Sequence, residues 1–400
     1  MKSKINSFYK MKLKNGLMVL FEKRNLGVVA VSANIKQGFA YESEKEKGIS
    51  HFTEHLMFKG TKSRTYKEIA DEIEKKGGVL NAYTDEEVTS YWNKVSKKHF
   101  SVGMDIASDL ILNPKFDSKE FEKEKKVILE EIKMYKDNPQ YHVLDRIKEL
   151  MYKKPFGISG IGTQKSVWDL SRDDLINFHN NFYKTNKMFL CIVGDTDFEQ
   201  IKKFGEKFPK NNCKVTEVFP EKINKMVVEK RKGVDQANFV FGFHFSGLNK
   251  RQRQAHEILD SILAGGMSSR LFEEIREKRG LAYAVKGIIE QGKNYGYQMI
   301  YLGTTKENIK KCNDIILKEI KKIKNLGLGD LNQAKEQLIG LRKIGNEESI
   351  NTMNALIQEE TLGDATEFYK YEENIKNVKL DDVKKLSNIK NYSSIALVPE

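Results

Sequence analysis

The sequence predicts an α+β protein made of two similar α/β domains, each with an antiparallel-rich mixed sheet covered by helices. The chain has 400 residues, more than one hydrophobic core ordinarily organises. Short apolar runs rich in β-branched residues alternate with longer segments of helical periodicity. The order of these elements in the first half recurs in the second, which indicates a duplicated unit.

The first half opens with strands and then a short helix. Residues 8–14 and 17–22 predict a hairpin, because an Asn-Gly turn separates the two runs. Residues 28–36 form a third predicted strand. A helix follows within residues 48–60, and Gly60 is expected to end it because glycine tolerates the left-handed conformation.

The rest of the first half alternates helices and strands. Thr65 and Glu68 have the spacing of a capping box, so they predict the start of a helix, which a Gly-Gly pair ends. The predicted elements that follow are strands 79–84 and 88–95, helices 97–112, 118–136 and one that ends near 151, a glycine-rich loop 155–162, a helix at 171–178 and a buried strand at 188–193.

Residues 208–225 lose this periodicity and contain prolines, asparagines and mixed charges, so they predict a linker. The predicted domains are therefore 1–210 and 225–400. The second half is predicted to contain strand 237–245, helices 250–264 and 269–278, strands 281–289 and 295–302, helices 305–325 and 329–345, and strand 394–398.

Composition excludes several classes of protein. The net charge is +13, but lysines are interspersed with glutamates and form no aromatic-flanked basic stripe, so no nucleic-acid partner is expected. No apolar stretch is long enough to cross a bilayer, so no membrane partner is expected. Three isolated cysteines and an N-terminus without a signal-peptide pattern favour the cytoplasm.

The stretch 48–60 contains the strongest candidate for a functional site. His51 and His55 are four residues apart, so a helix would place both on one face, together with Glu54. Two imidazoles with this spacing can share a Zn²⁺ ion, and an adjacent carboxylate can accept a proton from water. The alternative is an ordinary helix that contains two histidines and a glutamate by coincidence.

A catalytic zinc site needs a third protein ligand. Glu131 lies on the predicted helix 118–136, whose apolar face includes Ile128 and Ile132. Its neighbour Glu130 would point about a quarter-turn away. Glutamate is abundant in this chain, so residue type and spacing alone leave the third ligand open.

The His51-x-x-Glu54-His55 pattern, followed 76 residues later by Glu131, resembles the inverted-motif zinc peptidases of the pitrilysin and insulin-degrading enzyme family. In size and layout the chain is most similar to the branch that contains the mitochondrial processing peptidase and its bacterial relatives. The resemblance covers essentially the full length and includes Gly77-Gly78, Asn81-Ala82, Thr84, Thr89, Tyr91, 122–134, Gly162-Thr163, 193–195, 265–272, Arg276 and 280–283.

This resemblance implies roles for residues in both halves. It assigns zinc binding to His51, His55 and Glu131, activation of water to Glu54, and orientation of the ligands to Glu124. It also implies that Asn81 and Ala82 bind an extended peptide substrate and that Arg276 and Tyr283 stabilise the oxyanion of the tetrahedral intermediate. Taken alone, Asn81 would be an ordinary turn or strand-end residue, Arg276 an ordinary surface residue and Tyr283 a half-buried tyrosine.

The function implied by the resemblance is zinc-dependent endopeptidase activity on unfolded peptides or presequences. The family builds a closed chamber from two such two-domain halves, so the resemblance implies a homodimer, or a heterodimer with a related chain. Arg276 and Tyr283 would then complete the site of the opposite subunit. The alternative is a non-catalytic or regulatory subunit of a processing-peptidase-like complex.

Overall fold

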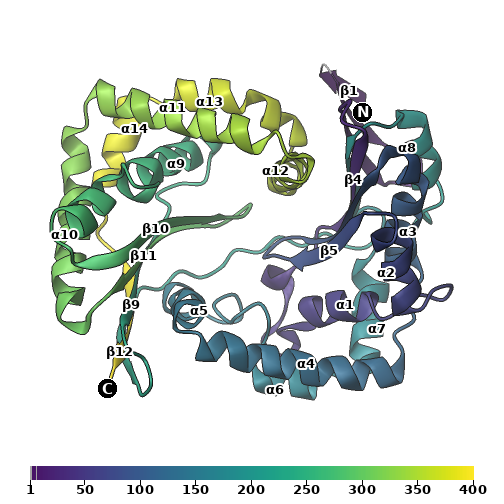
Figure 1. Ribbon diagram of the computed structural model, residues 1–400, viewed down its shortest axis with the longest axis horizontal. Coiled ribbons are helices and arrows are strands. Elements are labelled where there is room, and N and C mark those ends of the chain that lie inside the picture. Colours follow the sequence, from purple (N-terminus) through teal and green to yellow (C-terminus); the bar gives the residue numbers. More distant parts are fainter. Residues whose placement is uncertain (1, 6) are drawn as a thin grey trace. The chain divides into compact units, whose positions relative to one another are not determined.

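The computed structural model describes residues 2–5 and 7–400 of the chain, which folds into two compact units (Figure 1). Unit 1 comprises the chain up to Ile132, Gly160–Val218 and Gly345–Phe368. Unit 2 comprises Lys133–Ser159, Phe219–Ile344 and Tyr369–Glu400. Each unit contains one sheet, and each sheet is covered by helices.

The sheet of unit 1 contains seven strands in the order β1-β2-β3-β7-β4-β6-β5. β3 and β7 run parallel, and the other neighbouring pairs are antiparallel. The strands are β1 (Lys2–Ile5), β2 (Phe8–Lys12), β3 (Met18–Lys23), β4 (Val28–Ile35), β5 (Val79–Thr84), β6 (Thr89–Ser96) and β7 (Met188–Gly194).

The sheet of unit 2 contains five strands in the order β10-β11-β9-β12-β8. They are β8 (Met226–Arg231), β9 (Ala237–His244), β10 (Ala282–Gln291), β11 (Gly296–Thr304) and β12 (Ser393–Pro399). This order matches β5-β6-β4-β7-β3 of unit 1, and the parallel pair β8 and β12 takes the place of β3 and β7. The predicted duplication and the antiparallel-rich mixed sheets are therefore confirmed.

Helices cover both sheets. In unit 1 these are α1 (Ile49–Met57), α2 (Tyr66–Glu74), α3 (Phe100–Leu112), the greater part of α4 (Ser118–Asp137), α6 (Gln164–Asp169), α7 (Arg172–Phe182), α8 (Phe198–Gly205) and α12 (Ser349–Leu362). In unit 2 these are α5 (Pro139–Met151), α9 (Lys250–Ala264), α10 (Ile309–Lys322), α11 (Leu328–Gly345), α13 (Tyr371–Asn377), α14 (Leu380–Lys384) and a π-helix (Phe272–Glu277).

The two sequence halves exchange one helix each. α5 comes from the first half but packs on β9 and β12 of unit 2. α12 comes from the second half and packs on β4 and β7 of unit 1. Its buried side chains include Met353, Leu356 and Ile357. The predicted domains 1–210 and 225–400 do not include this exchange, although the chain does pass into unit 2 inside the predicted linker, after Val218.

Most predicted elements lie within a few residues of their observed bounds, and the Thr65–Glu68 capping box is present. One prediction was wrong in type, because part of the predicted α-helix 269–278 is the π-helix. The prediction also lacked β1, β8, α6, α8, α12, α13 and α14. β8 alternates exposed and half-buried residues along a sheet edge, so it has no continuous apolar run.

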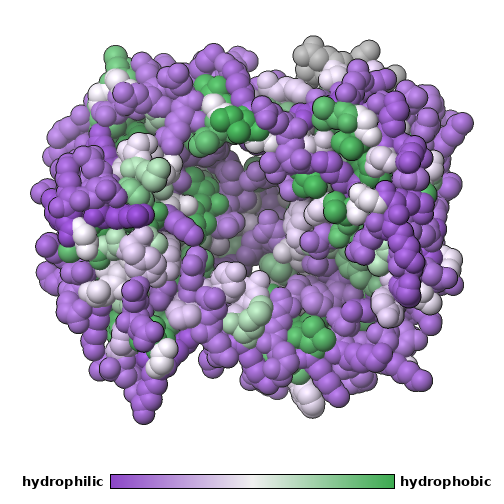
Figure 2. Space-filling model, in the orientation of Figure 1, coloured by the Kyte–Doolittle hydropathy of each residue, from purple (hydrophilic) through white to green (hydrophobic). Residues whose placement is uncertain are grey.

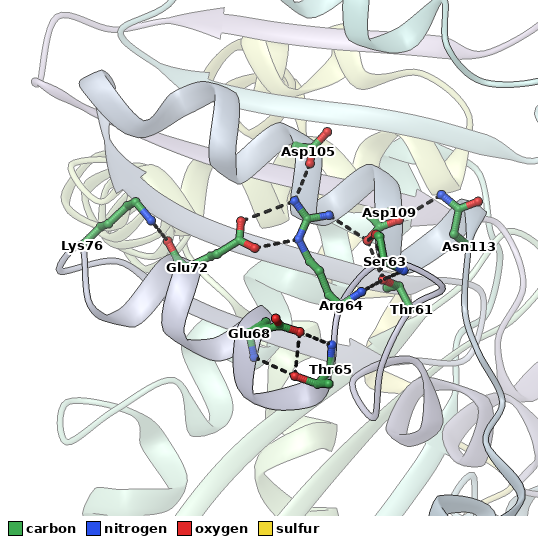
Figure 3. Close-up of polar contacts among 10 residues, drawn as sticks. All are labelled: Thr61, Ser63, Arg64, Thr65, Glu68, Glu72, Lys76, Asp105, Asp109 and Asn113. Atoms are coloured by element: carbon green, nitrogen blue, oxygen red, sulfur yellow. Dashed lines mark hydrogen bonds and ion pairs between the residues drawn. The ribbon is translucent and has the colours of Figure 1, made fainter.

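The turn that follows α1 is fixed by Arg64, as Figure 3 shows. The guanidinium of Arg64 donates to Glu72 on α2 at 2.9 Å, and to Asp105 and Asp109 on α3 at 2.6 and 2.8 Å. The Asp109 carboxylate also accepts a hydrogen bond from Thr61 at 2.6 Å. Three carboxylates on one guanidinium therefore hold the end of α1 against α2 and α3.

In the view of Figure 2, hydrophilic side chains cover most of the surface of each unit, as expected from the charged composition. Across the part of the chain that the structure describes, none of the helices has the length and apolar composition to cross a membrane.

Asp260 on α9 is a partly buried acid in unit 2. Its Oδ1 accepts a hydrogen bond from the side chain of Gln298 on β11 at 2.9 Å. Burial raises the pKa of Asp260 to about 6, because the hydrogen bond from Gln298 offsets only part of the cost of desolvating the carboxylate.

This pKa predicts how the Asp260→Asn substitution affects stability. The folded protein holds the proton of Asp260 more tightly than the unfolded chain, so the stability contributed by the neutral acid is lost as pH rises to about 6. As pH rises from 4.5 to 7.5, the free energy of unfolding of the Asp260→Asn variant should therefore increase by about 2 kcal/mol relative to that of the native chain. Urea unfolding at both pH values measures this difference.

The matched control is Asp314→Asn, which removes an exposed carboxylate from α10 of the same unit. Its stability relative to the native chain should change by less than about 0.5 kcal/mol over the same pH range. An equal pH dependence of the two variants would contradict the assigned shift of Asp260.

Candidate metal centre

The N-terminus of α1 is anchored by a buried carboxylate. Glu42 accepts hydrogen bonds from the backbone N–H groups of Gly48, at 3.1 Å, and Ser50, at 2.8 Å. The ammonium of Lys47 lies 3.7 Å from this carboxylate, and both side chains are fully buried. Gly48 has φ = +92°, and a Cβ there would lie 2.7 Å from the carbonyl oxygen of Ile161, so this position requires glycine.

α1 packs against α4, which lies beside it in Figure 1. Phe52 and Phe121 stack with their ring centroids 4.9 Å apart. Residues 121, 124, 128 and 131 of α4 have helical spacing, so the face of α4 that carries Phe121 also presents Glu124 and Glu131 toward α1. An aromatic pair of this kind adds about 0.5–1.5 kcal/mol beyond the burial of its area.

His51, His55 and Glu131 lie together. One ligand atom from each falls within 4.8 Å of the other two. The Oε2 atom of Glu131 lies 3.8 Å from Nε2 of His51 and 3.7 Å from Nε2 of His55. Among residues 2–5 and 7–400 this is the one group of three or more His, Cys, Asp or Glu side chains arranged in this way.

His55 is oriented by Glu124. Its Nδ1 atom lies 3.1 Å from Oε2 of Glu124, whose other oxygen accepts from Lys59 at 2.8 Å. Burial raises the pKa of Glu124, but the hydrogen bonds from His55 and Lys59 outweigh this effect, so the pKa of Glu124 lies below its usual range. Burial lowers the pKa of His55, but the charges of Glu124, Glu131 and Glu54 outweigh this effect and raise it. An ionised Glu124 accepts the proton on Nδ1 of His55, so the proton that His55 gives up on binding a metal is the one on Nε2, which faces Glu131.

The electrostatics of the group favour neutral imidazole at His51. Burial and the neighbouring charge of His55 lower the pKa of His51 to about 3. Burial also raises the pKa of Glu131, and the charge of His55 only partly opposes this effect. Neutral imidazole is the form that binds metal ions.

Glu54 lies on the same helix and is held by strand β5. The hydroxyl of Thr84 donates to Oε2 of Glu54 at 2.5 Å. Burial raises the pKa of Glu54, and the hydrogen bond from Thr84 reduces this rise. A carboxylate whose pKa is raised toward neutrality is a stronger base than an exposed one.

The donor set fits the zinc ion that the sequence resemblance implies. Two imidazole nitrogens and one carboxylate oxygen are typical ligands of catalytic zinc. Bonds of about 2.0–2.1 Å in tetrahedral geometry separate neighbouring ligand atoms by about 3.4 Å. The distances of 3.7 and 3.8 Å to Glu131 need to shorten by only a few tenths of an ångström.

Asn81 and Ala82 lie on β5, the last strand of the unit 1 sheet. Asn81 is exposed, and its side-chain oxygen accepts a hydrogen bond from the N–H of Ala82 at 2.8 Å. One side of β5 pairs with β6, so the other side is an edge to which an extended chain can add.

Arg276 and Tyr283 belong to unit 2. Arg276 lies in the π-helix, an element that often occurs at functional sites, and its guanidinium lies 4.7 Å from the centroid of the Phe272 ring. Tyr283 lies on β10, the edge strand of unit 2, and its side chain is 53% exposed. Gly303 on β11 leaves the space that this ring occupies.

A helix with two histidines and a glutamate, completed by a carboxylate from a second helix, is the arrangement of a metallopeptidase centre. The model of the family described as Insulinase (Peptidase family M16) matches residues 18–164, and the model described as Peptidase M16 inactive domain matches residues 169–338. The chain belongs to peptidase family M16, the insulinase family, as the resemblance indicates.

Curated relatives agree with this assignment. The chain is 32% identical to a zinc protease of Rickettsia felis over 399 residues, which cover 96% of this chain and 95% of the relative. It is 30% identical to the zinc protease YmxG of Bacillus subtilis over 85% of each chain. Its fold matches the crystal structure of a protease from Helicobacter pylori with a TM-score of 0.90 at 21% identity, covering 98% and 99% of the two chains.

Three residues around the site were not predicted to have a role there. Lys59 follows His55 by four residues, so helical spacing could have identified it as a neighbour of the same carboxylate. Thr84 and Glu42 reach α1 from a strand and from a turn, and no local pattern in the sequence indicates these contacts.

Two adjacent glutamates on α4 test the metal group. Glu131→Gln should weaken zinc binding by at least about 100-fold, because it removes a charged ligand, whereas the exposed Glu130→Gln should leave the affinity within about twofold. Competition with a chromophoric chelator measures the affinity of both variants. Equal effects of the two substitutions would contradict the assignment of Glu131.

Proposed function

We propose that this chain is a zinc-dependent endopeptidase that hydrolyses unfolded peptides or presequences. The observation that carries the proposal is the group of His51, His55 and Glu131, with Glu54 on the same helix. Membership of family M16 and relatives named zinc proteases support it. All three donor atoms are in place, which argues against the alternative of a non-catalytic or regulatory subunit.

In this proposal His51, His55 and Glu131 hold zinc. Zinc supplies Lewis acidity, which polarises a peptide carbonyl and makes a water molecule more acidic. Glu54 accepts the proton of the attacking water as its oxygen bonds to the carbonyl carbon, and delivers that proton to the leaving amine as the C–N bond breaks. Thr84 keeps the Glu54 carboxylate oriented for both transfers.

The substrate binds as an added strand along β5, next to Asn81 and Ala82. Backbone hydrogen bonds in this mode do not depend on side chains, which suits a peptidase that accepts different unfolded sequences. The edge-strand position of β5 and the exposure of Asn81 support this part of the proposal. Expectations of no nucleic-acid or membrane partner, and of a cytoplasmic location, stay predictions.

The chain acts as a dimer in this proposal, and Arg276 and Tyr283 stabilise the oxyanion in the site of the opposite subunit. Both residues are half-exposed in unit 2, where neither side chain is buried in the core. One chain carries both the metal group and this pair, so a homodimer is favoured over a heterodimer. Two such chains would enclose the closed chamber that the resemblance implies.

The proposed activity is tested with a quenched fluorescent peptide library. Cleavage should stop on addition of a chelator and return when zinc is added back. Glu54→Gln should lower kcat/KM by about 100- to 10,000-fold while zinc content stays at the native level, because it removes only the proton acceptor. Undiminished cleavage by Glu54→Gln would overturn its role as the base. A chain that neither binds zinc nor cleaves peptides would be the non-catalytic subunit.

Mixed dimers test the trans arrangement. An Arg276→Ala chain and a Glu54→Gln chain are each expected to be nearly inactive alone. When they are mixed and allowed to exchange, one of the two sites in a heterodimer should contain native Glu54 and native Arg276 and recover activity. The measurement is peptide cleavage as a function of mixing ratio, and a mixture no more active than its components would contradict the arrangement.

A further inference from the structure

Lys59 lies beside the metal group but belongs to none of the roles described above. It follows α1, and its backbone N–H donates to the carbonyl of Leu56 at 3.1 Å, so the turn stays close to the helix. Lys59 is four residues after His55, and this spacing lets both side chains point in the same direction, toward α4. Both contact one carboxylate, that of Glu124.

The two oxygens of Glu124 have separate partners. Oε2 lies 3.1 Å from Nδ1 of His55, and Oε1 lies 2.8 Å from Nζ of Lys59. The terminal torsion of a glutamate has a broad energy well, so a carboxylate held at one oxygen can still rotate. Contacts at both oxygens fix its plane, and with it the direction of the hydrogen bond to His55.

This ion pair differs from an ordinary surface pair. The Glu124 side chain is 7% exposed and that of Lys59 is 32% exposed, so loss of the ammonium would leave a largely buried carboxylate with one partner fewer. The next lysine of α4, Lys125, donates instead to the backbone carbonyls of Trp168 and Leu170. The ammonium that contacts Glu124 is thus supplied by the turn after α1, so the pair also joins that turn to α4.

We propose that Lys59 is a positioning residue of the metal centre, acting through Glu124 to aim the imidazole of His55. With Glu124 fixed at both oxygens, Nε2 of His55 stays directed at Glu131, 3.7 Å away. Without Lys59 the carboxylate rotates, the imidazole loses its fixed orientation, and the bound metal loses affinity. This inference rests on the metal site of the proposed function.

The test measures the zinc dissociation constant of the full chain by competition with a chelator, and needs no peptide cleavage. Lys59→Met should weaken zinc binding by roughly 10- to 100-fold, as expected for loss of a group that orients a ligand. Lys62→Met removes the same charge from an exposed side chain three residues away and should leave zinc affinity within about twofold. Lys59→Arg, which retains a cationic donor, should recover most of the affinity.

A double-mutant cycle separates a positioning role from a purely structural one. If Lys59 acts through Glu124, Lys59→Met should have no further effect on zinc affinity in a Glu124→Gln chain. The urea midpoint of each metal-free variant shows whether it is folded. Zinc binding by Lys59→Met within twofold of the native chain, or equal effects in both backgrounds, would overturn the inference. A native chain that binds no zinc would overturn the proposed metal site itself.

Discussion

Two imidazoles four residues apart on one helix can share a metal ion only if that helix is held still against the carboxylate that completes the site. Unit 1 meets this requirement at both ends of α1. Buried Glu42 holds the N-terminal backbone, the Phe52–Phe121 stack packs the helix on α4, and the Glu124 carboxylate contacts His55 near its C-terminal end. The Arg64 network fixes the turn that follows. These contacts determine which side chains can meet at the metal group.

The metal group also brings two acidic side chains, Glu54 and Glu131, together at a partly buried site. Burial raises the pKa of Glu54, and the charge of Glu131 adds to this effect, while burial also raises the pKa of Glu131. A chain selected for stability alone would not place these carboxylates beside two histidines, because desolvation and repulsion both cost free energy. A divalent cation compensates both costs, which is a physical reason to expect metal binding and stability to be linked here.

The sequence predicted those features that depend on neighbours along the chain. The spacing of His51, Glu54 and His55 indicates one helical face, and strand patterns indicate the duplicated sheets. Glu131 could be chosen over Glu130 only by resemblance, because its selection depends on how α4 packs against α1. The contacts of Glu42 and Thr84 were not predicted, since they depend on tertiary packing. The exchange of α5 and α12 left no signal either, because an apolar helix face does not specify which sheet it covers.

The exchange of helices has a consequence for synthesis on the ribosome. β4 and β7 are complete once the first half has emerged, but α12, which covers them, ends at Leu362. At about 5–20 residues per second, the intervening chain takes on the order of 10 s to appear. During this time the surface of β4 and β7 that α12 later covers is exposed, and α5 is present before the strands it packs on. The nascent chain must therefore stay soluble while the first sheet lacks α12 and α5 lacks its sheet, so neither sequence half can complete the packing of its unit alone.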